Sequence, residues 1–206
     1  MATREKLIDG ALAAIREHGI AGVSARTIAT AAGVNQALVF YHFGSVDDLL
    51  AEACRSATAA RVAAYRPRFA AVGSLRELLD LGRGLHEREQ AEGNLAVLAQ
   101  LLAGAQTDAR LAEATAVALR LWTVEIEAVL HRLLDGSPVA PVADPAGLAR
   151  AVSAAFIGLE LYDGVDPAAA RAAFDALERL AVLVEVVDDL GPLARRAVRA
   201  KLRDLT

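Results

Sequence analysis

The sequence predicts an all-α protein, and three observations lead to this fold class. Apolar residues occupy 55% of the 206 positions, with alanine and leucine dominant, whereas aromatic residues account for only 4%. Alanine and leucine favour helices, and the few aromatic residues offer little material for a sheet. The apolar residues also recur at helical spacing, and the prolines fall near segment boundaries. A chain of this length can bury a sizeable core, and we expect one compact chain with two sub-regions.

The first two helices are predicted from their apolar spacing and from the residues at their ends. Residues 3–18 form the first helix, because its apolar residues recur three and four positions apart, and Gly19 ends it. Ser24 can cap a second, short helix whose apolar side holds Ile28, Ala29 and Ala32. Gly33 then ends this helix, since glycine accepts the left-handed backbone of a sharp turn.

The third helix follows after so few residues that the pair predicts a helix-turn-helix unit. Asn35 is placed to cap a helix that covers roughly 36–43. Ala29, Gly33 and Val39 supply what such a unit needs: a small residue where the helices touch, a turn former and a core anchor on the second helix. A rotation of about 100° per residue around Val39 puts Phe43 inward and Ala37 and Tyr41 outward, with Leu38 and Phe40 on the two shoulders. The outward side could face a DNA major groove.

Helix starts and stops divide the rest of the chain. A fourth helix begins at Ser45, with Asp48 as a capping partner, and ends before Pro67. Ser74, Asn94 and Asp108 mark three further starts, and the last of these helices continues to Gly136. Residues 137–145 form a proline-rich loop. Two more helices follow, at about 145–163 and 167–190, each starting with an aspartate followed by proline.

The run GVNQALVFYHFGSVDDLL, residues 33–50, is similar to the first-domain signature of TetR-family transcriptional regulators. The resemblance covers roughly the first 50 residues. It implies a homodimer that binds a double-stranded DNA operator with a three-helix domain, here residues 1–45. It also implies a larger helical domain, residues 46–206, that binds a small-molecule effector and dimerises. We therefore expect a repressor that an apolar ligand releases from its operator, with a DNA-binding protein without an effector as the alternative.

The candidate DNA-binding residues come from the turn geometry and from this resemblance. Gln36 can hydrogen-bond an adenine edge in two places, and it lies at a helix start, where base contacts concentrate. Tyr41 and His42 match the family pattern, which implies backbone contacts for both. The full candidate set is Arg26, Thr27, Asn35, Gln36, Ala37, Leu38, Phe40, Tyr41 and His42.

Each of the sharper assignments has an ordinary alternative. Gln36 can simply be solvated, and Leu38 and Phe40 can pack against the first helix instead of contacting thymine methyl groups. Arg26 matches a family position that reaches DNA from the second helix, but it can also form a surface ion pair. The chain departs from the family at Phe40, where many members have tyrosine, and at Val46, where many have lysine. A hydroxyl and a positive charge that we would expect to contact DNA phosphates are therefore absent.

The N-terminal region has unusually few positive charges for a DNA-binding domain. Residues 1–50 carry four cationic and five anionic side chains, within a chain of net charge −4. Attraction to phosphate is therefore expected from local groups such as Arg4, Lys6 and Arg26, and from amide donors at helix N-termini. We predict a shallow salt dependence, because few counterions are displaced when few phosphates are neutralised.

The later helices supply candidates for the effector site and the dimer contact. Polar and aromatic groups interrupt long apolar faces, which fits an apolar cavity with a few orienting contacts. The candidates are Gln100, Trp122, His86, Glu125, Glu160 and Tyr162, with a satisfied core residue as the alternative for each. The helices at about 145–163 and 167–190 combine alanine-rich faces with large apolar residues. They are the candidate dimer contact, and a hairpin packed only in its own core is the alternative.

The end of the chain, residues 191–206, carries five cationic side chains and one anionic side chain. It could touch DNA. The commoner structure is a terminal helix held by Leu193, Val198 and Leu202 with a solvated basic face. Removing it should then lower thermal stability without changing operator affinity.

Composition also argues against several other classes of protein. Cys54 is the only cysteine, which excludes an internal disulfide and a cysteine-rich zinc site, and neither a metal nor a cofactor is expected. The N-terminus does not resemble a signal peptide, and we find no apolar run long enough to span a bilayer, so a soluble cytoplasmic protein is predicted. An enzyme that uses Cys54 and His86 is the rival from another class. We predict no catalytic residue, because no motif surrounds either one.

Overall fold

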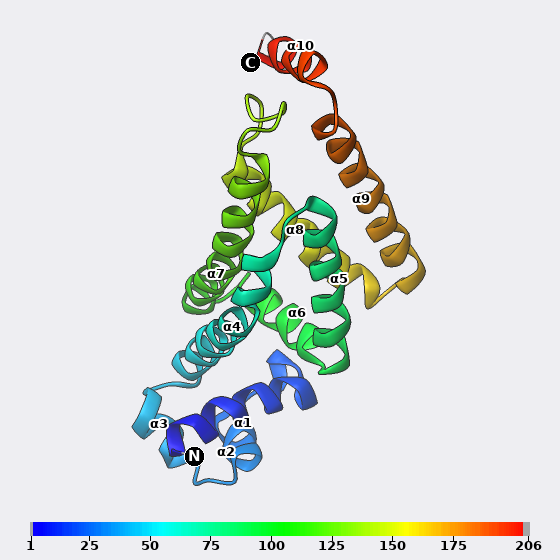
Figure 1. Cartoon of the computed structure of the whole chain (residues 1–206). Helices are drawn as coiled ribbons and strands as arrows, with labels where there is room; N and C mark the ends of the chain where they lie inside the picture. Colours follow the sequence, from blue (N-terminus) through cyan, green and yellow to red (C-terminus); the bar gives the residue numbers. More distant parts are fainter. Residues whose placement is uncertain (1, 204–206) are drawn as a thin grey trace. The chain divides into compact units, whose positions relative to one another are not determined.

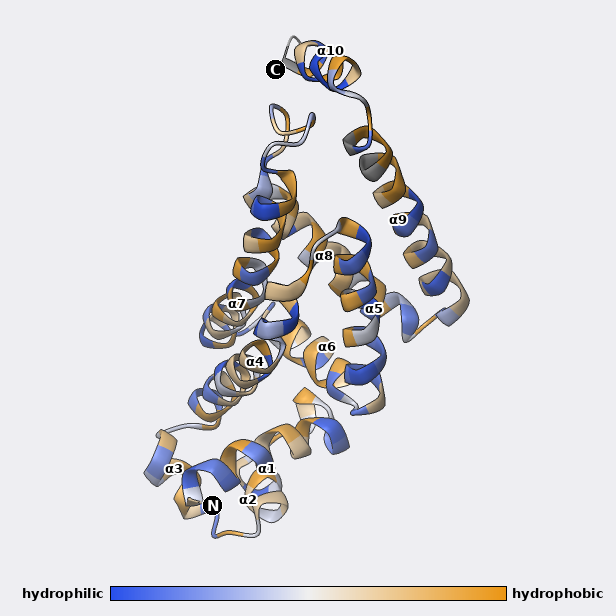
Figure 2. Cartoon of the chain, in the orientation of Figure 1, coloured by the Kyte–Doolittle hydropathy of each residue, from blue (hydrophilic) through white to orange (hydrophobic). Residues whose placement is uncertain are grey.

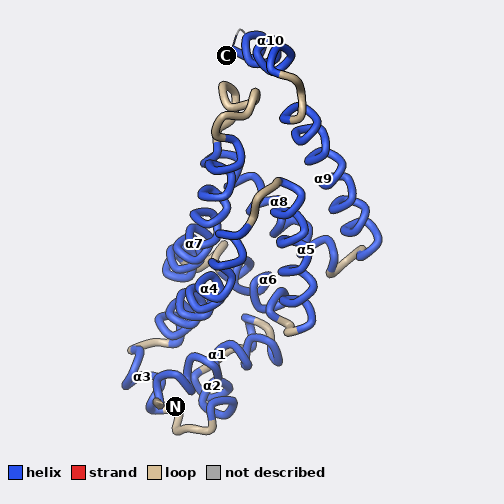
Figure 3. The backbone as a smooth tube through the Cα atoms, viewed as in Figure 1, coloured by secondary structure: helices blue, strands red, loops and turns tan. Residues whose placement is uncertain are grey.

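The computed structural model describes residues 2–203, with the side chains of residues 184, 185, 188 and 203 left out. Asp204, part of the predicted basic segment, lies outside the described residues. Within this range the chain forms helices and no strand, which confirms the all-α prediction (Figures 1 and 3). The helices are α1 (Thr3–His18), the short 3-10 helix η1 (Ile20–Gly22), α2 (Ala25–Ala32), α3 (Ala37–Phe43), α4 (Val46–Ala71), α5 (Leu75–Ala91), α6 (Asn94–Gly104), α7 (Ala109–Leu134), α8 (Pro145–Asp163), α9 (Pro167–Asp188) and α10 (Pro192–Arg203).

These helices form two compact units. Unit 1 contains residues 1–64 and 88–121, and unit 2 contains residues 65–87 and 122–206. Unit 1 therefore includes the predicted DNA-binding region together with the first part of α4, all of α6 and the first part of α7. None of the helices among the described residues is long and apolar enough to cross a membrane.

Unit 1 is built around one apolar core to which most of its helices contribute. Leu7 and Ile15 of α1, Ile28 of α2, Val39 of α3 and Leu49 of α4 are almost completely buried in it. α6 and α7 add Val97, Leu101, Leu111 and Ala118 to the same cluster. α1 and α2 pack closely at Gly10, where a β-carbon would lie 2.8 Å from Cβ of Ala32 and 2.9 Å from the carbonyl oxygen of Ile28. Only glycine allows this approach.

The predicted helix starts of both units are largely confirmed. Ser24, Ser45, Ser74 and Asp108 each accept a hydrogen bond from the backbone amide three residues ahead, at 2.7–3.2 Å. Asp166 accepts from the amides of Ala168 and Ala169. α6 begins at Asn94 as predicted, but its side chain does not cap the helix: its oxygen accepts a hydrogen bond from Arg16 at 2.8 Å, and Gly93 precedes it in a left-handed conformation.

The prediction that the fourth helix ends before Pro67 is wrong. α4 continues to Ala71 with Pro67 inside it. The turn beyond the proline is held by tertiary packing, because Tyr65 and Phe69 are buried in the core of unit 2. Arg132 also donates to the carbonyl oxygens of Phe69 at 2.9 Å and Val72 at 3.3 Å, which satisfies acceptors at the helix end. These contacts stabilise the end of α4 by more than the helix loses because proline has no amide hydrogen to donate.

Unit 2 has its own core and leaves one of its helices with an apolar side facing solvent. Tyr65, Leu85, Val129, Leu134 and Ala149 belong to this core. α8 and α9 pack against each other as a pair, and apolar residues recur along α9 (Figure 2). α9 starts at Pro167 as predicted and ends at Asp188, two residues earlier than expected.

The final basic segment forms α10, but the predicted role of Leu193 is wrong. Leu193 is 82% exposed, so it does not hold the helix against the protein. Val198 and Leu202 are partly buried, and polar contacts also hold the helix. Arg195 and Arg199 donate hydrogen bonds to backbone carbonyls in the loop that follows α7.

Candidate nucleic-acid interface

The turn between α2 and α3 is fixed by backbone geometry and one side chain. Gly33 has φ 64° and ψ 38°, the left-handed conformation that lets the chain leave α2 abruptly. The Asn35 side chain accepts a hydrogen bond from the amide of Ala37 at 2.8 Å, which caps α3 as predicted. Val39 is completely buried and anchors α3 to α1 and α2. The helix-turn-helix is therefore rigidly attached to the core of unit 1.

The orientation of α3 agrees with the rotation predicted around Val39. Gln36, Ala37 and Tyr41 are exposed, and the Tyr41 side chain is 81% accessible. Phe43 is partly buried against the unit 1 core, on the side opposite to this exposed edge. The exposed edge has the length and composition of a surface that can enter a major groove.

The two apolar shoulders of α3 differ from each other. Leu38 is partly buried and packs against the unit 1 core, which favours the packing role for this residue. Phe40 is 50% exposed, so a large part of its ring is available for contact with an apolar group such as a thymine methyl. The Tyr41 and His42 rings meet edge to face, with their centroids 5.0 Å apart.

The candidate residues on α2 are also unequal. The Thr27 hydroxyl accepts from the amide of Ser24 at 2.8 Å and donates to its carbonyl oxygen at 3.0 Å, so it belongs to the cap of α2. Arg26 is exposed and forms no ion pair with a carboxylate in the part of the chain that the structure describes. Its charge therefore remains available to phosphate.

Other cations of unit 1 are engaged within the protein. Arg4 of α1 forms an ion pair with Glu52 of α4 at 2.9 Å, and its guanidinium lies 5.1 Å from the centre of the Phe43 ring. The hydrogen bond from Arg4, supported by Arg55 and Ser56, lowers the pKa of Glu52 below its ordinary value against the opposing effect of burial. Arg110 pairs with Asp48 at 3.2 Å. Arg4, expected from the sequence to attract phosphate, thus helps to fix α1 and α3 on α4.

Comparison with known proteins identifies this arrangement. Residues 7–53 match the model of the tetR family of bacterial regulatory proteins. The N-terminal part of the chain therefore matches the DNA-binding region of the TetR family. The family consists of DNA-binding transcriptional regulators, and the helix-turn-helix described above lies inside the matched residues.

Solved structures share this TetR-family fold over most of the chain. A protein from Rhodococcus sp. assigned as a TetR-family transcriptional regulator is 24% identical over 91% of this chain and 98% of its own, with a TM-score of 0.71. A protein from Streptomyces coelicolor A3(2) assigned as a transcriptional regulator is 27% identical over 87% of this chain and 98% of its own, with a TM-score of 0.68. The multidrug binding protein EbrR, solved in complex with proflavin, is 27% identical over 85% of this chain and 99% of its own, with a TM-score of 0.58. No curated protein matches the chain.

The effector candidates of the chain do not gather at one place. Gln100 lies in unit 1, where its side-chain oxygen accepts a hydrogen bond from the amide of Ile20 at 3.0 Å. This bond links α6 to the short helix after α1. The other five candidates belong to unit 2.

Two of these five, His86 and Glu160, come together in a buried cluster. His86 Nδ1 of α5 lies 2.8 Å from Glu160 Oε1 of α8, and His86 Nε2 lies 3.7 Å from Asp163 Oδ2. Phe156 and Phe174 flank the imidazole, with ring centroids 6.5 and 5.6 Å away. Asp163 was not a candidate from the sequence, although its position three residues after Glu160 puts both carboxylates on the same side of α8.

The remaining candidates lie in other surroundings. Trp122 contacts the aromatic rings of Tyr65 and Phe69, with centroids 6.0 and 6.2 Å away. Glu125 forms an ion pair with Arg66 at 2.7 Å. The Tyr162 side chain is 61% exposed, so it faces solvent in this structure.

The region predicted for dimerisation presents an apolar surface. We define the α8–α9 surface by its exposed large side chains. These are Leu161, Tyr162, Val165, Leu180, Leu183 and Val186, each at least half exposed. Exposed apolar groups gathered on one helix pair are typical of a surface that another molecule covers.

The cysteine invoked for the rival enzyme does not resemble an activated nucleophile. Cys54 is buried in the unit 1 core, and its sulfur lies 4.0 Å from the Thr115 hydroxyl oxygen. Burial raises the pKa of its thiol, and the hydrogen bond to Thr115 only partly opposes this. A raised pKa disfavours the thiolate that a nucleophile needs.

Proposed function

We propose that this TetR-family regulator is a homodimeric repressor that binds a near-palindromic operator and is released from it by a small-molecule effector. The observation that carries the proposal is the exposed edge of α3. Gln36, Ala37, Phe40 and Tyr41 face outward from a helix whose anchor, Val39, is completely buried. A rigid helix that presents polar and apolar contacts on one side is suited to direct base recognition.

The residues that would contact DNA play different parts in this proposal. Gln36 reads a base edge, and Phe40 contacts a thymine methyl group. Arg26, Tyr41 and His42 bind the phosphate backbone and fix the register. Thr27 and Asn35 already serve as helix caps, so their contribution is to hold α2 and α3 in position.

Two-fold symmetry follows from the α8–α9 surface in the same proposal. A second copy of the chain would cover its exposed leucines and valines, and a symmetric dimer would present two α3 helices to successive turns of the duplex. The operator is then expected to be close to palindromic.

Release by an effector is the third part. The aromatic residues around Trp122 and the cluster around His86 give unit 2 both apolar and polar groups for a ligand. EbrR, a relative in fold, is a multidrug binding protein. An effector that binds better to a state with altered spacing between the two α3 helices lowers operator affinity by the coupling free energy. Such a regulator works in the cytoplasm, where the operator is located.

Selection of bound sequences from random duplexes tests the DNA-binding part. We expect a palindromic consensus, and we expect Gln36→Ala to relax the preference at one symmetric base pair, by about 1–3 kcal/mol. Gln106→Ala makes the same change at an exposed glutamine of unit 1 outside the helix-turn-helix, and it should leave the consensus unchanged. Absence of any preferred sequence would refute operator recognition.

Salt titration of operator binding tests the small number of phosphate contacts. Because Arg4 and Arg110 are paired inside unit 1, few cations remain to displace counterions. We expect log affinity to fall with log salt at a slope clearly shallower than about −8. A slope of that size or steeper would show that more phosphates are neutralised than these residues allow.

Sedimentation tests the dimer. Leu180→Glu combined with Leu183→Glu should convert the dimer to a monomer at micromolar concentration, because the two charges would be buried at the contact. Val124→Glu, at a valine of α7 that is 60% exposed, is the control and should leave the dimer intact. A wild-type protein that is already monomeric would contradict the proposal.

Ligand binding can be followed through Trp122, the single tryptophan of the chain. Mass spectrometry of the natively purified protein would detect a retained ligand, and proflavin can serve as a first probe by fluorescence. A ligand that changes Trp122 fluorescence should weaken operator binding. If a saturating ligand leaves operator affinity unchanged, release by that ligand is refuted, while operator recognition stands.

A further inference from the structure

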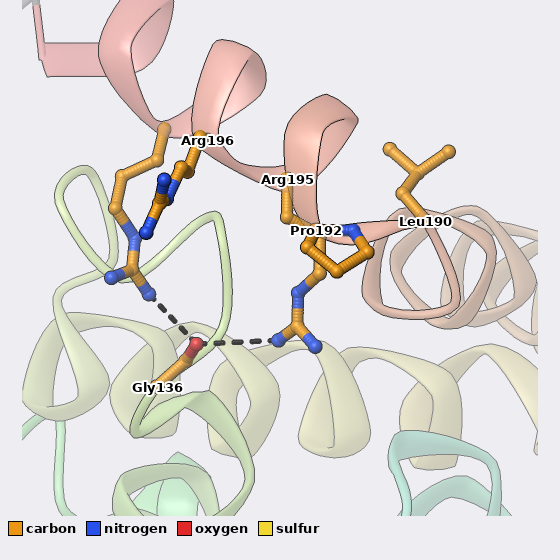
Figure 4. Close-up of a pocket in the computed structure, with 6 residues that line it drawn as sticks. Gly136, Leu190, Pro192, Arg195 and Arg196 are labelled. Carbon is orange, nitrogen blue, oxygen red and sulfur yellow. Dashed lines mark hydrogen bonds between the residues drawn. The ribbon is translucent and has the colours of Figure 1, made fainter.

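A cavity that the DNA-binding and effector proposals do not use lies beside α10. It has a volume of about 390 Å³ and is lined by Gly136, Leu190, Pro192, Arg195, Arg196 and Arg199, all of unit 2 (Figure 4). Three of the six lining residues are arginines on consecutive turns of one helix. Its volume falls within the range of roughly 300–1,000 Å³ that is typical of small-molecule sites.

The arginine side chains converge instead of spreading along the helix. Arg195 donates a hydrogen bond to the carbonyl oxygen of Gly136 at 3.3 Å, and Arg199 donates to the same oxygen at 2.7 Å (Figure 4). Arg199 also donates to the carbonyl oxygen of Ser137 at 2.9 Å. Two positive charges are therefore held around a single backbone oxygen, where they repel each other.

This local excess of positive charge is not balanced by the surrounding protein. Among the residues that the structure describes, no carboxylate forms an ion pair with Arg195, Arg196 or Arg199. Arg196 is exposed and makes no hydrogen bond with a described residue. A backbone carbonyl offers only a partial negative charge, so the guanidinium groups keep donors that an anion can use.

The remaining walls of the cavity are apolar. Leu190, from the segment between α9 and α10, and Pro192, the first residue of α10, line it beside the arginines. Inorganic anions gain nothing from such walls, whereas an anion attached to an apolar group can use both parts. The convergence of the arginines into a hollow also distinguishes this site from a flat basic face that would follow a duplex backbone.

We propose that this cavity binds a small organic anion, a carboxylate or a phosphate monoester carried on an apolar group. The guanidinium groups of Arg195, Arg196 and Arg199 hold the anionic head, and Leu190 and Pro192 contact the apolar part. A bound anion relieves the repulsion between Arg195 and Arg199, and it strengthens the attachment of α10 to the loop after α7.

Titration of the full-length protein at constant ionic strength tests the site, with the arginine side-chain N–H signals followed by NMR. The probes are hexanoate and hexyl phosphate, with hexanamide as the uncharged match and acetate and inorganic phosphate as matches without the apolar group. Hexanoate or hexyl phosphate should shift the arginine signals saturably, and hexanamide should not. Equal binding of hexanoate and hexanamide, or of each organic anion and its small match, would overturn the proposal.

A pair of variants distinguishes this site from general attraction to a basic helix. Arg196→Gln removes a positive charge from the lining without removing a hydrogen bond that holds α10. It should weaken the binding of the more tightly bound organic anion about fivefold. Lys201→Gln removes the same charge at an exposed position of α10 outside the lining, and it should have no such effect. Equal weakening by both variants would overturn the proposal. The proposal would also be overturned if a random-sequence duplex shifted the arginine signals while the small anions did not. That result would assign α10 to nucleic acid binding.

Discussion

The two units of this chain solve the problem of burying apolar surface in different ways. Unit 1 encloses its large apolar side chains except on the outer edge of α3, where Phe40 and Tyr41 are exposed. Its polar side chains cap helices or tie one helix to the next, as Ser24 and Gln100 do. Unit 2 leaves Leu180 and Leu183 of α9 more than half exposed, while it buries several charged groups. Outside the edge of α3, unit 1 therefore keeps its large apolar side chains inside, and unit 2 has a surface that favours association.

Truncation of one large apolar residue in each unit should have very unequal effects on the free energy of unfolding. Ile28→Ala in the unit 1 core should lower the free energy of unfolding by about 2–5 kcal/mol, because Ile28 is completely buried and a cavity would remain. Leu183→Ala on α9 should change it by less than about 0.5 kcal/mol in the monomer, because the side chain is 61% exposed there. Urea denaturation at low protein concentration measures both.

The same two variants should exchange their ranking in an association assay. Leu183→Ala should weaken the proposed dimer, and Ile28→Ala should leave it nearly unchanged under conditions where the protein remains folded. If Leu183→Ala destabilises the isolated chain as much as Ile28→Ala does, the α8–α9 surface belongs to a core and the contrast between the units is lost.

A second pair compares helix packing at glycine. Gly10→Ala in α1 should destabilise by about 1–2 kcal/mol, because the new β-carbon would lie within 3 Å of Ala32 and of the Ile28 carbonyl. Gly82→Ala in α5 of unit 2 should stabilise by about 0.5–1 kcal/mol, since a β-carbon there meets nothing within 4 Å and alanine favours the helix. Thermal unfolding of the two variants, measured side by side, should show shifts of opposite sign. Two shifts of the same sign would mean that α1 and α2 are not locked at Gly10.

The smallest expected effect concerns acid stability in unit 1. Arg4 lowers the pKa of Glu52 in the folded state, so this carboxylate stabilises the fold above its unfolded pKa, and the contribution is lost as the pH falls through the folded pKa. Ion pairs with partners as exposed as Arg4 contribute about 0.2–1 kcal/mol. Glu52→Gln should therefore lose less stability than the wild type between neutral pH and about pH 3. Glu113→Gln, at an exposed glutamate of α7, should follow the wild-type pH profile. A Glu52→Gln profile that also coincides with the wild type would exclude this contribution.

The sequence predicts unit 1 closely because its signals are local. Ser24, Gly33 and Asn35 each act on backbone atoms within a few residues, so their effects follow from the chain itself. The burial of Val39 and the exposure of Tyr41 follow from helical rotation alone. What sequence could not supply was the pairing of Arg4 with Glu52, since 48 positions separate them.

In unit 2 the local structure and the grouping of side chains depend on tertiary contacts, which the sequence does not reveal. Pro67 was expected to end α4, but buried Tyr65 and Phe69 and the hydrogen bonds from Arg132 carry the helix past it. Glu160 was a candidate from the sequence, but its contact with His86 of α5 is visible only in the structure. The arginines of α10 were visible as a charge run, whereas their convergence on Gly136 depends on a loop some 60 positions away.

The bond between Gln100 and Ile20 imposes an uneven constraint on sequence divergence. Its donor is a main-chain N–H, which every amino acid except proline supplies, so position 20 can drift as far as packing allows. Its acceptor is a side chain, so nearly every replacement at position 100 removes the link between α6 and η1. Selection that preserves this link would leave its mark at position 100 and almost none at position 20.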